Sequence, residues 1–237
     1  MKKLLIGLMV LGLASAASAS LITSDDFSYT GTVSNGGWVG FSGAAMPTVD
    51  GSTAIGGAGD GDARLVYADQ GSGAVFASVN LNITDVGTSG NSYLFGFSDG
   101  TLMEGRFGVQ YVNASTYNIG VFGAGTAPLG STMTLNVNQS YLITMMLDQA
   151  NGIHSLWVDS DGTDFATPDA TTTIAASSGN DGFFLRQGDN WDNGDASWTV
   201  DNLVAATTFA EVIPEPTTMA LFGVAVGMLV LLRKRTA

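Results

Sequence analysis

Three short stretches of the sequence combine Asp or Asn side chains with Gly, and their oxygen atoms could bind a calcium ion. They are residues 59–62, 159–164 and 189–195. Calcium needs about six to eight oxygen ligands, and closely spaced carboxylates on a turn can supply several of them. The second stretch offers Asp159, Asp161 and Asp164, but it lacks the Asp-x-Asp-x-Asp-Gly order and the distal Glu of an EF-hand. Calcium is therefore the candidate cofactor, and a plain Asx-rich turn is the alternative that we favour.

The third stretch could bind a sugar, because it places an aromatic ring among hydrogen-bonding side chains. A sugar site needs an aromatic face for the C–H surface of the ring and polar groups for the hydroxyls. Trp191 would be the stacking platform, and the hydroxyl partners would be Asp189, Asp192 and Asn193. Crowded carboxylates repel an anionic polymer, so we expect a neutral polysaccharide as the ligand.

The remaining tryptophans and the sole histidine are predicted to have mainly structural roles. Trp157 and Trp198 lie in alternating apolar patterns, which favours a place in the core. Trp38 lies in a glycine-rich stretch and fits either the core or a binding site. The sequence has no Ser or Cys nucleophile motif for which His154 could act as the general base. We therefore expect His154 to be a surface residue or one with satisfied hydrogen bonds.

Alternation of apolar and polar residues predicts that most of the chain is built from β-strands. In residues 75–83 every second side chain is apolar, as in a strand with one buried face. Asn151-Gly152 marks a hairpin turn, and no stretch before residue 213 has convincing helical spacing. The predicted strands are 25–29, 63–68, 75–83, 93–97, 107–111, 117–121, 132–137, 141–147, 153–159, 182–187 and 197–206. Because many of the 32 Gly separate these short strands, we expect an all-β fold, an antiparallel β-sandwich of the jelly-roll type.

The charge of the chain excludes nucleic acid as a partner. Of the 8 Lys and Arg, only Arg64, Arg106 and Arg186 lie between the two terminal segments, whereas 20 of the 21 Asp and Glu lie there. Such a negative field repels phosphate backbones. No Cys occurs, so the fold has neither disulfides nor thiolate metal ligands and must be held by its core. A body of about 190 residues is enough for one such core, so we expect one domain.

The first 19 residues have the pattern of a Sec signal peptide. Lys2 and Lys3 precede an apolar stretch over residues 4–13, and the segment ends on Ala17-Ser18-Ala19. This order of a basic, an apolar and a small-residue region is typical of a secretory signal. Cleavage after Ala19 would leave Ser20 as the first residue of the exported protein.

The last 24 residues predict a single transmembrane helix with a processing signal before it. Pro214, Glu215 and Pro216 bar a helix, and an uncharged apolar run follows at 217–232. As a helix this run reaches about 24 Å, against a bilayer core of about 30 Å, which makes it a marginal span. A basic cluster in this position stays in the cytoplasm, so the preceding chain would lie on the far side of the membrane. The basic residues that follow the run are Arg233, Lys234 and Arg235.

The tripeptide, the apolar run and the basic end resemble the PEP-CTERM sorting tail of exported proteins from exopolysaccharide-producing Gram-negative bacteria. The resemblance implies an exosortase as partner, a membrane protease that removes the tail. It also implies transient anchoring in the inner membrane, followed by transfer to the cell surface or the extracellular matrix. The expected organisation is a signal peptide at 1–19, a body at 20–212 and a sorting tail at 213–237.

The second half of the body resembles the closing strands of concanavalin A-like lectin/glucanase domains, also called LamG-like domains. Near the mature start, Asp25-Asp26-Phe27 is also similar to that family. The resemblance implies a sandwich of that type more firmly than it implies a ligand. The segments that carry it are 140–148, 155–159, 183–186 and 199–212.

A residue-by-residue comparison with glucanases of this fold predicts that the chain is not an enzyme. Retaining glucanases carry their carboxylates on one strand in a Glu-x-Asp-x-x-Glu pattern, so that alternate residues face one cleft. That pattern is absent from the sequence. The body has only Glu104 and Glu211, and we expect Glu104 to lie in a turn over residues 101–105.

The sequence therefore predicts an exported, exosortase-sorted protein with a non-catalytic carbohydrate-binding module associated with exopolysaccharide. One alternative is a purely structural component of the extracellular matrix without a discrete ligand site. A more remote alternative is a degenerate glycoside hydrolase.

Overall fold

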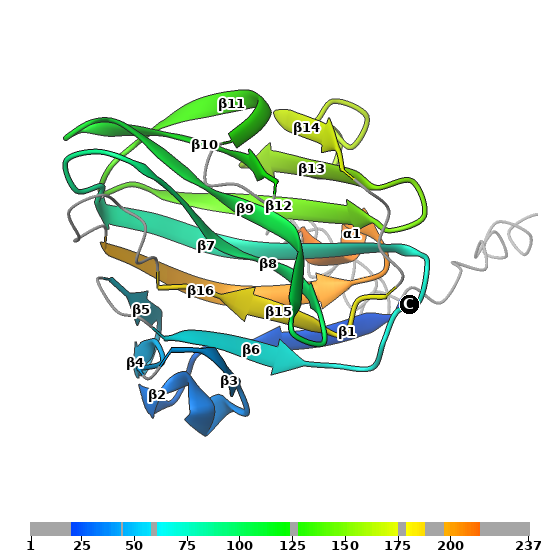
Figure 1. The fold of residues 1–237 in the computed structure, drawn as a ribbon, viewed down its shortest axis with the longest axis horizontal. Coiled ribbons are helices and arrows are strands. Elements are labelled where there is room, and N and C mark those ends of the chain that lie inside the picture. The colour runs from blue at the N-terminus through cyan, green and yellow to red at the C-terminus, as the bar shows by residue number, and fades with distance from the viewer. Residues whose placement is uncertain are drawn as a thin grey trace, which may run out of the picture.

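The protein folds into two antiparallel β-sheets packed face to face, as Figure 1 shows for the computed structural model. The structure describes residues 20–43, 45–57, 61–123, 128–174, 179–187 and 197–213. Within these ranges one sheet has nine strands and the other has seven. The all-β class and the antiparallel sandwich predicted from the strand periodicity are confirmed. The signal peptide and the helix at 217–232 lie outside the described residues.

The nine-stranded sheet has the spatial order β14-β13-β12-β7-β16-β5-β4-β2, and β1 pairs with β16. Its longest members, β7 and β16, lie side by side in the middle of the sheet (Figure 1). Its strands are β1 (Leu21–Asp25), β2 (Thr30–Thr32), β4 (Thr48–Asp50), β5 (Ala54–Gly56), β7 (Ala74–Asp85), β12 (Ser140–Asp148), β13 (Ile153–Val158), β14 (Ala170–Thr173) and β16 (Ser197–Ala206).

The seven-stranded sheet has the order β11-β10-β9-β8-β15-β6-β3. Two short helices complete the fold: the 3-10 helix η1 (Val33–Gly36) and a single turn of α-helix, α1 (Phe209–Val212). No helix among the described residues is long and apolar enough to cross a membrane. The strands of this sheet are β3 (Val39–Ser42), β6 (Asp62–Val66), β8 (Asn91–Asp99), β9 (Leu102–Asn113), β10 (Thr116–Phe122), β11 (Pro128–Asn136) and β15 (Gly182–Leu185).

The core lies between the two sheets and follows the predicted alternation. On β7 the alternate side chains of Val75, Val79 and Ile83 are fully buried in one large hydrophobic cluster. The seven-stranded sheet contributes aromatic rings to the same cluster, among them Phe97 and Phe107, which meet edge to face at 6.2 Å between centroids. Burial of this apolar surface is the main source of stability, because the chain has no disulfides.

A second hydrophobic cluster covers part of the outer face of the nine-stranded sheet. Trp157 is buried there against Phe209 of α1, with 4.8 Å between the ring centroids, while Trp198 lies in the core between the sheets. The prediction that both tryptophans are buried is confirmed. Val212 and Ile213 belong to the outer cluster, and the backbone oxygen of Val212 accepts a hydrogen bond from Ser78 Oγ. The chain is thus attached to the sandwich up to Ile213.

Two predictions about local structure were wrong. Residues 25–29 are not a strand: β1 ends at Asp25, and Phe27 has a positive φ of 51°. Glu104 lies in β9 and not in a turn, because the reversal between β8 and β9 takes only Gly100 and Thr101. The sequence also missed five strands of three or four residues: β2, β3, β4, β5 and β14.

His154 faces the core, so its predicted place at the surface or among satisfied hydrogen-bond partners was also wrong. It pairs across the sheet with Leu147 of the core cluster, its exposed fraction is 1%, and its Nδ1 has no hydrogen-bond partner. Burial lowers the pKa of His154 to about 4. The imidazole is therefore neutral at pH 7, and protonating it in place would put an unpaired charge in the core.

We predict that His154 makes the fold sensitive to acid. Its folded-state pKa lies below the ordinary value of 6.5, so its contribution to stability is complete above pH 6.5 and is lost as the pH falls toward 4. The difference amounts to about 3 kcal/mol in the free energy of unfolding. Urea unfolding of the parent and of His154→Leu, between pH 7 and pH 4, measures it. The parent should lose this much more stability than the variant, and parallel pH profiles would contradict the prediction.

Candidate functional site

The carboxylate of Asp25, at the end of β1, organises the first turn of the mature chain. Its Oδ1 accepts a hydrogen bond from the backbone N–H of Phe27 at 2.8 Å. Its Oδ2 accepts two more, from Trp38 Nε1 at 2.7 Å and from the Tyr29 hydroxyl at 2.9 Å. Trp38 is buried and stacks on Phe27, with 6.1 Å between the ring centroids, so of its two predicted places it occupies the core. One buried carboxylate thus holds three aromatic residues in position.

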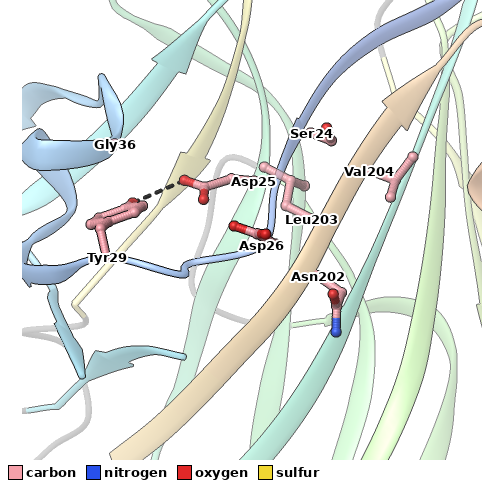
Figure 2. A pocket seen from close by; sticks show the side chains of 8 residues that line it. All are labelled: Ser24, Asp25, Asp26, Tyr29, Gly36, Asn202, Leu203 and Val204. Atoms are coloured by element: carbon pink, nitrogen blue, oxygen red, sulfur yellow. Dashed lines mark hydrogen bonds between the residues drawn. The ribbon is translucent and has the colours of Figure 1, made fainter. Parts of the chain in front are cut away.

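Tyr29 is held at the edge of this network with its hydroxyl pointing to Asp25 (Figure 2). Burial, and next the hydrogen bond to Asp25, raise the pKa of Tyr29, so its phenol stays protonated. Gly36 at the end of η1 leaves room for the ring, because a Cβ at that position would lie 2.2 Å from the Tyr29 hydroxyl oxygen. The position of Tyr29 therefore depends on both its partner Asp25 and the small residue beside it.

A β-bulge in β16 lies opposite this turn. Asp201 pairs with Asn80 and Val204 pairs with Ser78, so one extra residue is inserted in β16 between them. Asn202 lies within the bulge and adopts a left-handed backbone conformation, with a φ of 52°. Its side-chain amide donates a hydrogen bond to the Asp201 carboxylate. Bulges re-aim side chains and often border functional sites. Here the bulge presents the Asn202 side chain on the same side as the turn after β1.

The turn and the bulge line an open surface pocket of about 450 Å³. Figure 2 shows its lining coming from β1 and the following turn on one side and from β16 on the other. The lining side chains offer hydroxyl, carboxylate and amide groups together with one aromatic ring. The residues that line it are Ser24, Asp25, Asp26, Tyr29, Gly36, Asn202, Leu203 and Val204.

The carboxylates in and beside the pocket are in different environments. Asp26 is fully exposed, and hydrogen bonds from Ser28, by its side chain and then its backbone, lower the pKa of Asp26. Asp201 is partly buried, and this burial together with the nearby carboxylates of Asp26 and Asp50 raises the pKa of Asp201 against the effect of the Asn202 N–H. At pH 7 Asp26 is an ionised acceptor on the pocket wall. Such a group accepts hydrogen bonds from hydroxyls and repels anions.

The predicted sugar-binding residues and the predicted sorting residues lie outside the described residues. This applies to Trp191, Asp189, Asp192 and Asn193, and to the tail from Pro214 onward.

Each of the three predicted calcium ligands accepts a hydrogen bond from a different group of the protein. Asp159 accepts a hydrogen bond from the backbone N–H of Leu142, Asp161 accepts from Thr163, and Asp164 accepts from Ser160. In the part of the chain that the structure describes, no three acidic or histidine side chains are grouped so that they could hold a metal ion. The geometry therefore adds no support to calcium at these three residues, and it shows the Asx-type turn that we favoured at Asp161.

Tyr29 and Asn202, which line the pocket, were not predicted as site residues from the sequence. One signal for Asn202 exists: the adjacent polar residues Asp201 and Asn202 interrupt the alternation of β16 between Val200 and Leu203, as an inserted bulge residue does. Tyr29 has no comparable signal, because its place depends on the hydrogen bond to Asp25 across a turn.

Comparison with known proteins agrees with the two-sheet architecture and adds the sorting signal. No curated protein matches the chain. A solved sialidase structure is similar over 82% of this chain, with 14% identity and a TM-score of 0.51, but this chain spans only 19% of the sialidase. At this identity the likeness shows the fold alone: an all-β antiparallel two-sheet sandwich.

Two further structures are similar at TM-scores below 0.5. A glycosyl hydrolase family protein from Mycobacterium fortuitum matches with 13% identity over 78% of this chain and 99% of its own, at a TM-score of 0.46. The CBM2 module of the evolved Dit of Lactobacillus casei BL23 phage J-1 matches with 12% identity over 80% and 96%, at a TM-score of 0.49.

The C-terminal residues 212–235 match the PEP-CTERM protein-sorting motif. This confirms the tail that the Pro-Glu-Pro signature, the apolar run and the basic end predicted. Proteins with this motif are exported and sorted to the surface by an exosortase, so the motif implies processing of this chain by such an enzyme.

We predict that Asp25 is a stability residue and that its neighbour Asp26 is not. Asp25→Asn keeps the shape but replaces one acceptor oxygen by a donor, so it should lower the free energy of unfolding by about 2–4 kcal/mol. Asp26→Asn is the matched control, and it should leave stability unchanged within the error of urea unfolding. Equal effects of the two substitutions would show that the Asp25 network does not hold the turn.

Proposed function

We propose that this chain is an exported surface or matrix protein whose sandwich binds a neutral polysaccharide without catalysing a reaction. We further propose that the sandwich is of the concanavalin A-like, jelly-roll type. In this proposal the Sec signal at 1–19 directs export, and the helix at 217–232 anchors the protein in the inner membrane until the exosortase acts. The polysaccharide would be part of the exopolysaccharide layer in which the sorted protein resides.

The observation that carries the binding proposal is the chemistry of the pocket beside β1 and β16. Its volume of about 450 Å³ lies in the usual range for small-ligand sites, which is about 300–1,000 Å³. Tyr29 brings an aromatic ring, and Asp26, Ser24 and Asn202 bring the hydrogen-bonding groups that sugar hydroxyls need. The buried Asp25 network holds this lining before any ligand arrives, which lowers the cost of ordering it on binding.

Charge favours a neutral sugar at this pocket. Asp26 is ionised and exposed, and Asp50 and Asp201 lie close enough to affect one another electrostatically. An anionic sugar would meet these carboxylates without a bridging cation, whereas a neutral sugar can donate its hydroxyl protons to them.

Two alternatives remain, and each has its own readout. A structural matrix component without a ligand site would bind no glycan. One observation supports the degenerate hydrolase: the pKa of Asp201 is raised, and the pKa of the nearby Asp26 is lowered. A proton donor and its ionised partner in a hydrolase show the same pattern. However, both oxygens of Asp201 are engaged by its neighbour Asn202. Release of reducing sugar from a bound polysaccharide would establish the hydrolase.

We predict that Asn202→Gly weakens glycan binding without unfolding the protein. Glycine accepts the positive φ of Asn202 and removes the amide that lines the pocket, together with its hydrogen bond to the Asp201 carboxylate. The experiment is a neutral-glycan array probed with the full-length chain in a neutral detergent, and the signal of the variant should fall about tenfold for the glycan that the parent binds. Asn138→Gly is the matched control, because Asn138 is also exposed with a φ of 60° but does not line the pocket. Undetectable binding by the parent, or equal signals from both variants, would refute the pocket.

We predict that replacing Pro214, Glu215 and Pro216 together by Ala leaves the protein in the membrane at full tail length. The apolar run would persist, while the signature that the exosortase recognises would be lost. Mass spectrometry of the cell-associated and released forms measures the outcome, with Thr217→Ala as the control outside the signature. Trimming of the triple variant at the parental rate would contradict sorting through this motif.

A further inference from the structure

The three arginines between the terminal segments all lie on the outer face of the seven-stranded sheet. Arg64 is on β6, Arg106 is on β9, and Arg186 directly follows β15. This face also carries a small hydrophobic cluster, separate from the core, that includes Tyr93 and Phe184. Strand pairing places Arg106 beside Gly96, and Gly96 and Arg64 on either side of Phe184, so these residues form one row across the sheet. In a chain with 20 acids in its body, every base of the body is on one surface.

Two of these guanidinium groups flank one tyrosine ring. Tyr93 is on β8, between β9 and β15. The Cζ of Arg186 lies 4.3 Å from the ring centroid of Tyr93, and the Cζ of Arg106 lies 5.0 Å from it. Arg186 also donates a hydrogen bond to the Tyr93 hydroxyl, and its Nη1 lies 3.8 Å from the carboxylate of Asp62. The cation–π contacts fix both side chains close to each other on the sheet.

Arg106 differs from the other two in forming no ion pair among the described residues, although the carboxylate of Glu104, two residues before it on β9, is close enough to interact with it electrostatically. Its Nε donates to the backbone oxygen of Met103 at 3.1 Å, and its Nη1 donates to that of Gly123 at 3.2 Å. Arg64, in contrast, is bonded to the carboxylate of Asp181. The Arg106 guanidinium is therefore positioned by neutral backbone oxygens, and its charge is offset only by the longer-range effect of Glu104 and not by an ion pair.

We propose that Arg106, assisted by Arg186, binds the carboxylate of an acidic polysaccharide on this face. A guanidinium presents parallel N–H groups that match the two oxygens of a carboxylate, and a pre-positioned fork loses little entropy on binding. The half-buried side chains of Phe41 and Met103, which pack on the same cluster, supply apolar contact for the sugar ring. This site is separate from the pocket beside β1, whose carboxylates would repel the same ligand, and it does not depend on that pocket.

The test compares two polymers that share a backbone and differ in charge. Polygalacturonate and its fully methyl-esterified form are titrated into the full-length chain in a neutral detergent at low salt, and again at about 0.5 M NaCl. The parent should bind polygalacturonate at least tenfold more tightly than the ester, and the salt should weaken this binding because it screens exposed charges. Equal affinity for the two polymers, or preference for dextran sulfate over polygalacturonate, would overturn the proposal.

Variants then assign the binding to Arg106. Arg106→Met keeps the apolar stem and should reduce the affinity for polygalacturonate at least tenfold, while Arg106→Lys, which keeps the charge but not the fork, should reduce it less. Gln139→Glu is the control for net charge, since it also makes the chain more negative by one charge, at an exposed residue between β11 and β12, and it should change the affinity less than twofold. Parental affinity in Arg106→Met would overturn the proposal. Binding of a neutral glycan by that same variant would show that the function proposed for the pocket stands on its own.

Discussion

Strand β7 lies in the middle of the nine-stranded sheet, and the rest of the sandwich depends on the burial of its alternate side chains. It pairs with β12 along one edge and with β16 along the other. Five of its side chains, from Val75 to Ile83, are fully excluded from water in the cluster that both sheets share. Because the protein has no disulfide, a change that exposed this face would remove the main contribution that holds the two sheets together.

The long strands could be predicted because each has enough residues for its period to show. The strand predicted at 197–206 coincides with β16, and those at 75–83 and 141–147 lie within β7 and β12. The strands β7 and β12 each show at least three inward apolar residues in alternation, and β16 shows two such pairs, one on either side of its bulge. The burial of Trp157 was also predictable, but its place was not: its neighbour Leu156 faces the core between the sheets, so Trp157 lies on the outer face of β13, against Phe209 of α1.

What could not be predicted depends on contacts between distant residues or on elements too short to show a pattern. Strands β2, β4 and β5 have three residues each, fewer than one full alternation needs. The turn after Asp25 looks like a strand in sequence, since Phe27 and Tyr29 alternate, yet the Asp25 carboxylate bends the backbone by accepting the Phe27 N–H. The candidate pocket combines that turn with a bulge about 175 residues later in the chain. The gathering of the arginines likewise follows from strand order, which a single sequence does not reveal.

The attachment of Val212 and Ile213 to the sandwich determines how far the folded body can move from a bilayer before processing. Ile213, the last residue that the structure describes, lies in the outer cluster, and the apolar run begins at Thr217. Four residue steps span about 14 Å at full extension, and the two prolines stiffen that connection. With the run inserted in the lipid, the sandwich would stand within one domain width of the membrane. In the proposed membrane-anchored form, a protease that cuts at the motif would have to work between the folded domain and the bilayer, so the packing of Val212 and Ile213 that completes the fold would also limit which enzymes reach the motif.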